Sequence, residues 1–192
     1  MKLTPLLTLT LLGGAVAFGN PYQSQQEEMQ SVVATGQKAA SELIKTLGSN
    51  LKKELQANGP VAAAKFCSAN AFSLTSSVGD AFGETVSVKR VSLKERNPSN
   101  RPEADEKAVL EALQSLKEAG VVLPEYLVQQ SGADSYKYYK PLSINKEVCL
   151  KCHGEMKNKE LGDYLHEIYP ADKATGYRMG DLRGAIVVEI RK

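Results

Sequence analysis

Two of the chain's three cysteines lie in one short motif that could hold a cofactor covalently. Residues 149–153 read Cys-Leu-Lys-Cys-His, which is the spacing by which haem c attaches to proteins. In that chemistry two thiols add across the two vinyl groups of one porphyrin, and the adjacent histidine binds the iron. A redox disulfide and half of a zinc site are the alternative interpretations. The motif predicts one covalent haem c, held by Cys149 and Cys152, with His153 as an axial iron ligand.

The scarcity of cysteine and histidine limits the other sites that this chain could form. The sequence has 3 Cys, 2 His and no Trp, so a structural zinc site with four Cys or His ligands would have only these residues to draw on. The segment around the motif lacks the βαβ pattern of a thioredoxin-like redox protein. The formal net charge is +2 and charged residues make up 24% of the chain. This composition is typical of a globular protein and gives no electrostatic case for nucleic-acid binding.

The first residues have the features of a secretory signal peptide. Lys2 supplies a positive charge, the stretch from Leu3 to Phe18 is uncharged and rich in leucine, and residues 15–17 read Ala-Val-Ala, a small-residue cleavage pattern. The apolar stretch is shorter than the roughly 20 residues of a membrane-spanning helix. We therefore expect residues 1–17 to be removed on export, a periplasmic location, and no permanent membrane span after cleavage.

The iron of a haem c needs a second axial ligand opposite His153, and few residues could supply it. His166 lies off the apolar stripe of its helix, and Met156 follows His153 too closely for the chain to pass round the haem edge. Met179 lies in a turn with two glycines and would give a His/Met cytochrome. Cys67 lies on an apolar helix face and has no disulfide partner if the other two cysteines hold the haem. From the residues alone, Cys67 and Met179 remain equal candidates, because both residue types also occur as inert core residues.

The helices that position these residues follow from their end signals and from hydrophobic spacing. Asn20-Pro21 predicts the start of a long helix, and Asn58-Gly59-Pro60 predicts its end, because Gly accepts a left-handed conformation and Pro cannot continue the helix. A second helix is expected from Val61 to about Ser76. It places Cys67 on a face lined by small apolar residues.

The rest of the chain reads as strands with helices inserted between them. Strands are expected over 85–92, 126–129, 136–144 and 184–190, and helices from about 102 to 120 and from 161 to 168. This order predicts one α+β domain built on an antiparallel sheet. The chain then divides into a signal peptide over 1–17, an N-terminal helix over 18–60 and a haem domain over 61–192.

Six groups of residues, in this order, carry a resemblance to a known family. They are 63–67, 91–100, 139–142, 149–154, 169–172 with 174–177, and 180–185. The run Arg-Asn-Pro-x-Asn at 96–100 and the run Gly-Asp-x-Arg-Gly-Ala at 180–185 are the most specific. Together they resemble a family of c-type haem proteins with a PAS-like domain. Its members occur as exported bacterial proteins, including cyanobacterial ones, and as sensory regions of membrane histidine kinases.

The resemblance implies a fold and a ligand set. The fold is a PAS-like antiparallel sheet flanked by helices, and the axial ligands are His and Cys, which correspond to His153 and Cys67. A thiolate stabilises ferric iron, so it would lower the reduction potential relative to a Met ligand. Arg96, Arg101 and Arg183 lie in or beside the resembling stretches and are candidates for contacts with the haem propionates.

Three function classes follow from these expectations. The first is an exported monohaem cytochrome with His/Cys ligation that transfers electrons at low potential. The alternative is a redox or diatomic-gas sensor module that works through a partner protein. An enzyme such as a peroxidase is disfavoured, because a six-coordinate iron leaves no open position for a substrate. The expected partner is therefore a redox protein or a signalling protein.

Overall fold

The structure is a computed structural model that describes residues 21–192. Along the chain it contains α1 (Pro21–Asp80), β1 (Val86–Val91), η1 (Pro98–Asn100), α2 (Ala104–Glu118), β2 (Leu127–Gly132), β3 (Ser135–Ser143), α3 (Glu147–His153), α4 (Lys159–Ile168) and β4 (Leu182–Arg191). The signal peptide predicted for residues 1–17 lies outside the described part of the chain. Within residues 21–192 no helix is both long enough and apolar enough to cross a membrane.

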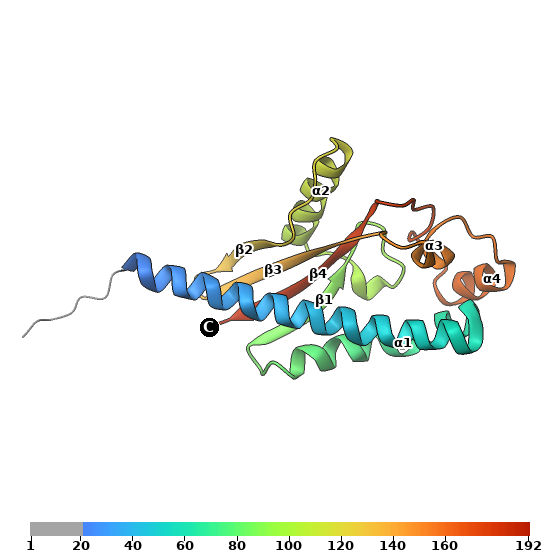
Figure 1. Cartoon of the computed structure of the whole chain (residues 1–192), viewed down its shortest axis with the longest axis horizontal. Coiled ribbons are helices and arrows are strands. Elements are labelled where there is room, and N and C mark those ends of the chain that lie inside the picture. The colour runs from blue at the N-terminus through green and yellow to red at the C-terminus, as the bar shows by residue number, and fades with distance from the viewer. Residues whose placement is uncertain (1–20) are drawn as a thin grey trace, which may run out of the picture.

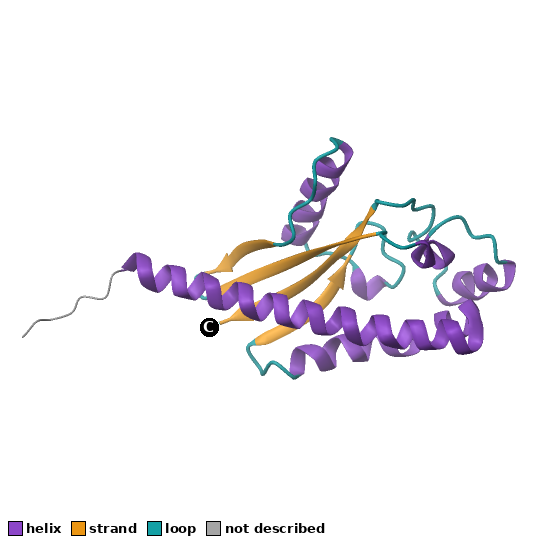
Figure 2. Ribbon diagram, viewed as in Figure 1, coloured by secondary structure: helices purple, strands orange, loops and turns teal. Residues whose placement is uncertain are grey.

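The four strands form one antiparallel sheet in the order β1-β4-β3-β2 (Figure 2). Each strand expected from the sequence is present, with ends that differ by a few residues. The last strand of the chain, β4, lies between β1 and β3, so Val188 pairs with Val88 on one side and Tyr138 on the other. The predicted α+β class with an antiparallel sheet is thus confirmed.

The end predicted at Asn58-Gly59-Pro60 is a bend inside α1. Gly59 has φ +79° and ψ −178°, a conformation that interrupts the helix and that glycine accepts without a Cβ clash. Pro60 then begins the second segment, where its missing N–H leaves no helical hydrogen bond unmade. The first segment of α1 crosses one face of the sheet, and the second segment runs back beside it toward β1 (Figure 1). This second segment carries Cys67.

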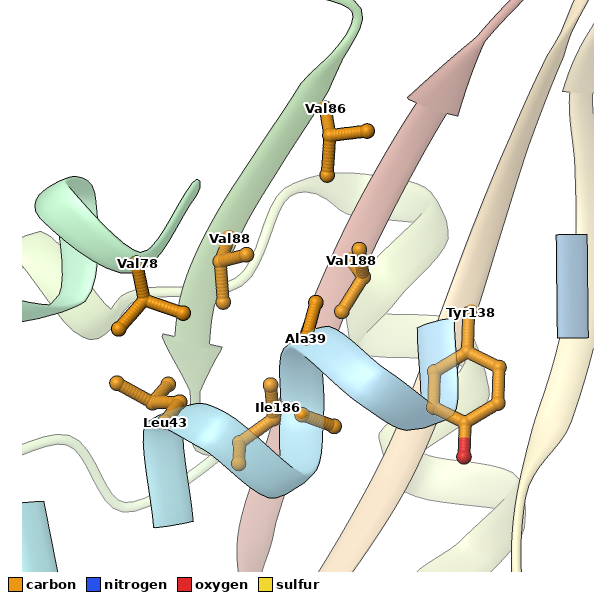
Figure 3. Packing of buried hydrophobic residues seen from close by; sticks show 9 residues of the cluster. Ala39, Leu43, Val78, Val86, Val88, Tyr138, Ile186 and Val188 are labelled. Atoms are coloured by element: carbon orange, nitrogen blue, oxygen red, sulfur yellow. The ribbon is translucent and has the colours of Figure 1, made fainter. Parts of the chain in front are cut away.

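The main core lies between α1 and the sheet (Figure 3). Leu43 of α1 is fully buried and packs with Val88 and Ile186 of the strands. Burying a side chain of that size stabilises the fold by about 1.5–3 kcal/mol. Gly36 lets the helix approach the sheet, since a Cβ there would lie 2.2 Å from the ring of Tyr138.

On the other face of the sheet, α2 is held by a group of charges that we call the α2 charge cluster. Its members are Lys89 of β1, Lys137 of β3, and Glu103, Asp105 and Glu106 at the start of α2. Glu106 is fully buried, and its Oε1 lies 2.7 Å from Lys89 Nζ and 3.4 Å from Lys137 Nζ. Its Oε2 accepts the N–H of Glu103 at 2.9 Å. Each buried charge in this cluster therefore has an opposite charge beside it.

The short helices α3 and α4 lie at one end of the sheet, near the bend of α1 (Figure 1). Asn158 caps α4 by accepting the N–H of Leu161 at 2.9 Å. Leu161 and Leu165 are buried and pack against Ala64 of α1. This end of the molecule brings α3, with its two cysteines and His153, to the second segment of α1.

Candidate functional site

Helix α3 presents Cys149, Cys152 and His153 on one side, because residues three and four apart share a helix face. All three cysteines of the chain are free thiols and are partly buried. Cys149 packs against a small core around Ala174. Cys152 packs in the cluster that includes Ala64. The Cys152 side of α3 therefore faces the second segment of α1.

The ring of His153 is held by the backbone of the loop before β4. Its Nδ1 lies 2.9 Å from Ala174 O, and since a carbonyl only accepts, Nδ1 carries the hydrogen and Nε2 keeps its lone pair. The ring of Tyr177 meets it edge-on, with centroids 6.1 Å apart. Burial, assisted by the charges of Arg183 and Arg96, lowers the pKa of His153 to about 3. The structure thus holds a neutral imidazole whose Nε2 keeps its lone pair for a ligand bond.

Cys67 lies on the second segment of α1 between Ala63 and Ala71, which are both buried. The face of small apolar residues predicted from the sequence is therefore present. Burial and the nearby Cys152 raise the pKa of the Cys67 thiol, while Arg90 and Arg96 oppose this. Cys152 packs in the cluster of Ala64, which precedes Cys67 by three residues in the same helix segment. The fold therefore brings the segment with Cys67 to the side of α3 that carries Cys152, although the two residues are far apart in the sequence.

Met179, the other candidate for the sixth ligand, lies in the turn before β4. Its side chain is 49% exposed and borders a groove of about 610 Å³ together with Leu150 of α3 and Gly154, which follows α3. Cys67, in contrast, is partly buried. His166, which lies off the apolar stripe of its helix, is exposed, and Met156 packs against the apolar cluster between α1 and α4.

Three arginines, which we call the arginine cluster, gather around Cys67 and His153: Arg90, Arg96 and Arg183. Burial lowers the pKa of both Arg90 and Arg183. Neither of these two forms an ion pair with a carboxylate within residues 21–192, where Arg96 pairs with Asp172 at 2.8 Å. The cluster therefore has more buried positive charge than its protein partners neutralise.

The individual arginines differ in what they contact. Arg183 Nη1 donates to Ser92 Oγ at 2.6 Å, and its guanidinium lies 5.4 Å from the centre of the Tyr177 ring. The Nε of Arg90 is buried and has no hydrogen-bond partner among residues 21–192. Such a group costs about 1–3 kcal/mol when it stays unpaired. Arg90 and Arg183 thus keep hydrogen-bonding capacity that an anionic group could use.

Arg96 and Arg101, expected to contact propionates, have other partners. Arg96 Nε donates to Asp172, and its Nη2 donates to Cys152 O at 2.6 Å and to Ala174 O at 3.3 Å. The Arg101 side chain is 69% exposed, and its Nε lies 3.4 Å from a carboxylate oxygen of Glu95. The structure brings Arg96 and Arg183 into the arginine cluster and leaves Arg101 outside it.

Arg90 is a site residue that the sequence interpretation missed. A signal was present, because Arg90 follows Val86 and Val88 at alternate positions of an expected strand and so shares their buried face. An arginine on a buried strand face needs an anionic partner. That spacing identifies Arg90 once the face occupied by the valines is known to pack against α1.

The residues present fit the haem c that the sequence predicts. Two thiols on one side of α3, a neutral imidazole with a free Nε2, and a third thiol on the facing helix match the attachment and ligand chemistry of that group. The unpaired Arg90 Nε and the excess charge of the arginine cluster match its two carboxylates.

Comparisons with known proteins agree with this fold. No curated protein matches the chain. The crystal structure of the cyanobacterial heme-protein Tll0287 matches with a TM-score of 0.62 and 25% sequence identity, covering 91% of this chain and 98% of that chain. A family model described as Tll0287-like matches residues 20–191. The resemblance inferred from the sequence motifs is thereby confirmed, and the chain belongs to the Tll0287-like family.

Proposed function

We propose that this chain is an exported monohaem c-type cytochrome that transfers electrons at low potential. Cys149 and Cys152 would form the thioether bonds, and His153 and Cys67 would be the axial ligands. The observation that carries this proposal is that α1 packs Ala64, three residues before Cys67, in one cluster with Cys152 of α3, the neighbour of His153. The matching solved structure, described as a heme-protein, supports it.

Each residue of the site would have a separate role in binding the haem. When bound, the haem supplies a one-electron ferric/ferrous couple. His153 would bind through Nε2 while its Nδ1–H donates to Ala174 O, a second hydrogen bond that fixes the ring and raises its basicity. Cys67 would bind as a thiolate, and its negative charge favours the ferric state and lowers the potential. Arg90 and Arg183 would hold the anionic carboxylates.

The spectrum of the ferric protein tests the ligand set. Wild type is expected to show low-spin thiolate features in EPR and optical spectra, and Cys67→Ala is expected to lose them while it keeps its covalent haem. Met179→Ala is the matched control and should retain the wild-type spectrum, because Met179 is exposed and is not a ligand in this proposal. An unchanged spectrum in Cys67→Ala would contradict the proposed ligation.

Export is proposed from residues 1–17 and has its own test. The mass of the protein recovered from the periplasm should correspond to residues 18–192 plus one haem. A full-length mass, or a haem-free protein after coexpression with haem-attachment factors, counts against this proposal.

A second candidate function, a haem-based redox or gas sensor acting through a partner protein, is favoured by the position of Cys67. The residue lies on a helix segment that continues through the Gly59 bend into the segment packed across the sheet. If Cys67 leaves the iron on reduction, its helix can shift relative to the sheet. Carbon monoxide binding to the ferrous wild type would support the sensor. Binding only in Cys67→Ala would show that Cys67 stays bound and would favour the electron carrier.

A further inference from the structure

Two of the resembling stretches, 96–100 and 169–172, meet in the structure through one buried ion pair. Arg96 Nε lies 2.8 Å from Asp172 Oδ2, and the two side chains are only 13% and 11% exposed. The loop with Asp172 leads from α4 to β4, whereas Arg96 follows β1. A bidentate or multiply bonded arginine at a partly buried site has a defined geometry, unlike an exposed ion pair.

The same arginine also ties that loop to the end of α3. Its Nη2 donates to Cys152 O at 2.6 Å and to Ala174 O at 3.3 Å. Asp172 Oδ1 accepts the N–H of Ala174 at 2.7 Å. Ala174, which is fully buried, is therefore held through its N–H by Asp172 and through its carbonyl by Arg96.

The carbonyl held in this way is the acceptor for His153. His153 Nδ1 lies 2.9 Å from Ala174 O, so the position of that oxygen sets the direction of the imidazole ring. Two more backbone bonds join the same segments: Tyr177 N–H donates to His153 O at 2.9 Å, and Gly176 N–H donates to Gly154 O at 3.1 Å. The side chains of Arg96 and Asp172 close a network that otherwise consists of main-chain bonds.

We propose that Arg96, fixed by Asp172, is a positioning residue that orients His153 by holding the carbonyl of Ala174. This inference rests on the proposed function, in which His153 is an axial ligand. It assigns Arg96 a role other than the propionate contact expected from the sequence. Its chemistry requires the planar fork of arginine, because one guanidinium must reach Asp172, Cys152 O and Ala174 O together, whereas an ammonium is a single point of charge.

The decisive variant is Arg96→Lys, which keeps the charge and removes the fork. The thioethers would keep the haem in place, so EPR can report the iron ligands even if His153 binds the iron less firmly. We expect more than one low-spin species in EPR where wild type has one. We also expect the ferric-to-ferrous ratio at a fixed potential to fall about tenfold, because a poorly bonded imidazole is a weaker donor. Tenfold corresponds to a rise of about 59 mV for a one-electron couple.

The control is Arg101→Lys, an equivalent change at an exposed arginine of the same segment, and it should leave both readings at the wild-type values. If Arg96→Lys gives the wild-type spectrum and potential, the inference is overturned. If Arg96→Lys does not fold, Asp172→Asn decides: several low-spin species support the inference, and one wild-type species overturns it. A wild type without a His/thiolate spectrum would instead refute the proposed function, and this inference with it.

Discussion

The α2 charge cluster and the arginine cluster are both partly buried, yet they are built differently. In the first, two lysines contact three carboxylates, and Glu106, which is fully buried, lies within 3.4 Å of both ammonium groups. In the second, three arginines share one carboxylate partner within residues 21–192, that of Asp172, and the Nε of Arg90 is left without a hydrogen bond. The first is neutralised by the protein itself, and the second is not.

The charges of the α2 charge cluster stabilise the fold through protein partners, whereas those of the arginine cluster have too few protein partners. A buried charge is stable when an opposite charge lies beside it, as Lys89 Nζ lies 2.7 Å from Glu106 Oε1 at the start of α2. We expect the excess positive charge beside Cys67 and His153 to cost stability in the haem-free protein, and an anionic group that binds there to recover it. The two clusters should therefore respond in opposite ways to removal of one charged side chain.

The largest expected effect is in the α2 charge cluster. Glu106→Gln removes the anion that lies between two ammonium groups and leaves Lys137, which is only 7% exposed, with less compensation. We expect a loss of about 3 kcal/mol in the free energy of unfolding, measured by urea denaturation. The control Glu111→Gln removes an exposed partner of Lys107 and should change the free energy by less than about 0.5 kcal/mol. Equal effects of the two variants would show that the cluster does not hold α2.

A smaller effect of opposite sign is expected in the arginine cluster. Arg90→Met removes a guanidinium whose buried Nε has no hydrogen-bond partner among residues 21–192, so the haem-free protein should gain about 1 kcal/mol in the free energy of unfolding. The haem-loaded protein should lose stability, because the carboxylates then lack a partner. Unfolding both forms in urea gives the comparison. A loss in the haem-free form as large as that of Glu106→Gln would mean that Arg90 is a structural residue.

The smallest expected effect is the pH dependence of the α2 charge cluster. Hydrogen bonds from Lys89 and Lys137 hold the pKa of Glu103 below its usual 4.5, and Lys137 holds the pKa of Asp105 below its usual 3.8. As pH falls below about 4.5, these carboxylates take up protons in the unfolded chain before the folded one. The free energy of unfolding therefore falls until the folded-state pKa values are passed.

Lys137→Met should flatten this decline, since it removes a cation that both carboxylates contact. Lys107→Met, which removes only the exposed partner of Glu111, is the control and should leave the acid side of the profile unchanged. If the free energy of unfolding falls with pH in parallel for wild type and Lys137→Met, Lys137 does not lower the pKa values of Glu103 and Asp105.

Much of the fold could be predicted because its signals are local. The Asn58-Gly59-Pro60 bend and the four strands depend on residue types within a short window, so end signals and alternation locate them. The helical state of α3 was not predicted, since its 7 residues are too few to show a hydrophobic period. The cluster around Tyr138 and Leu43 required the strand order, in which the last strand enters the middle of the sheet.

The candidate site also has a part that the sequence could predict and a part that it could not. The Cys-x-x-Cys-His motif is contiguous, so the attachment chemistry that it predicts follows from five neighbouring residues. The contacts of Arg96 are with residues far along the chain, such as Asp172, and no local pattern specifies them. Arg101 shows the converse, because it lies in the same stretch as Arg96 yet faces solvent.

The sequence alone determined the chemistry that this chain can perform: two thiols and an imidazole at a fixed spacing, with one further cysteine and few other ligands. Covalent spacing is a property of the chain, so it needs no fold to be recognised. Only the tertiary structure showed that Met179 is exposed while Cys67 is partly buried, and it placed buried positive charge beside Cys67. Those outcomes depend on which helix faces packed together, and packing is decided by the whole core rather than by any one segment.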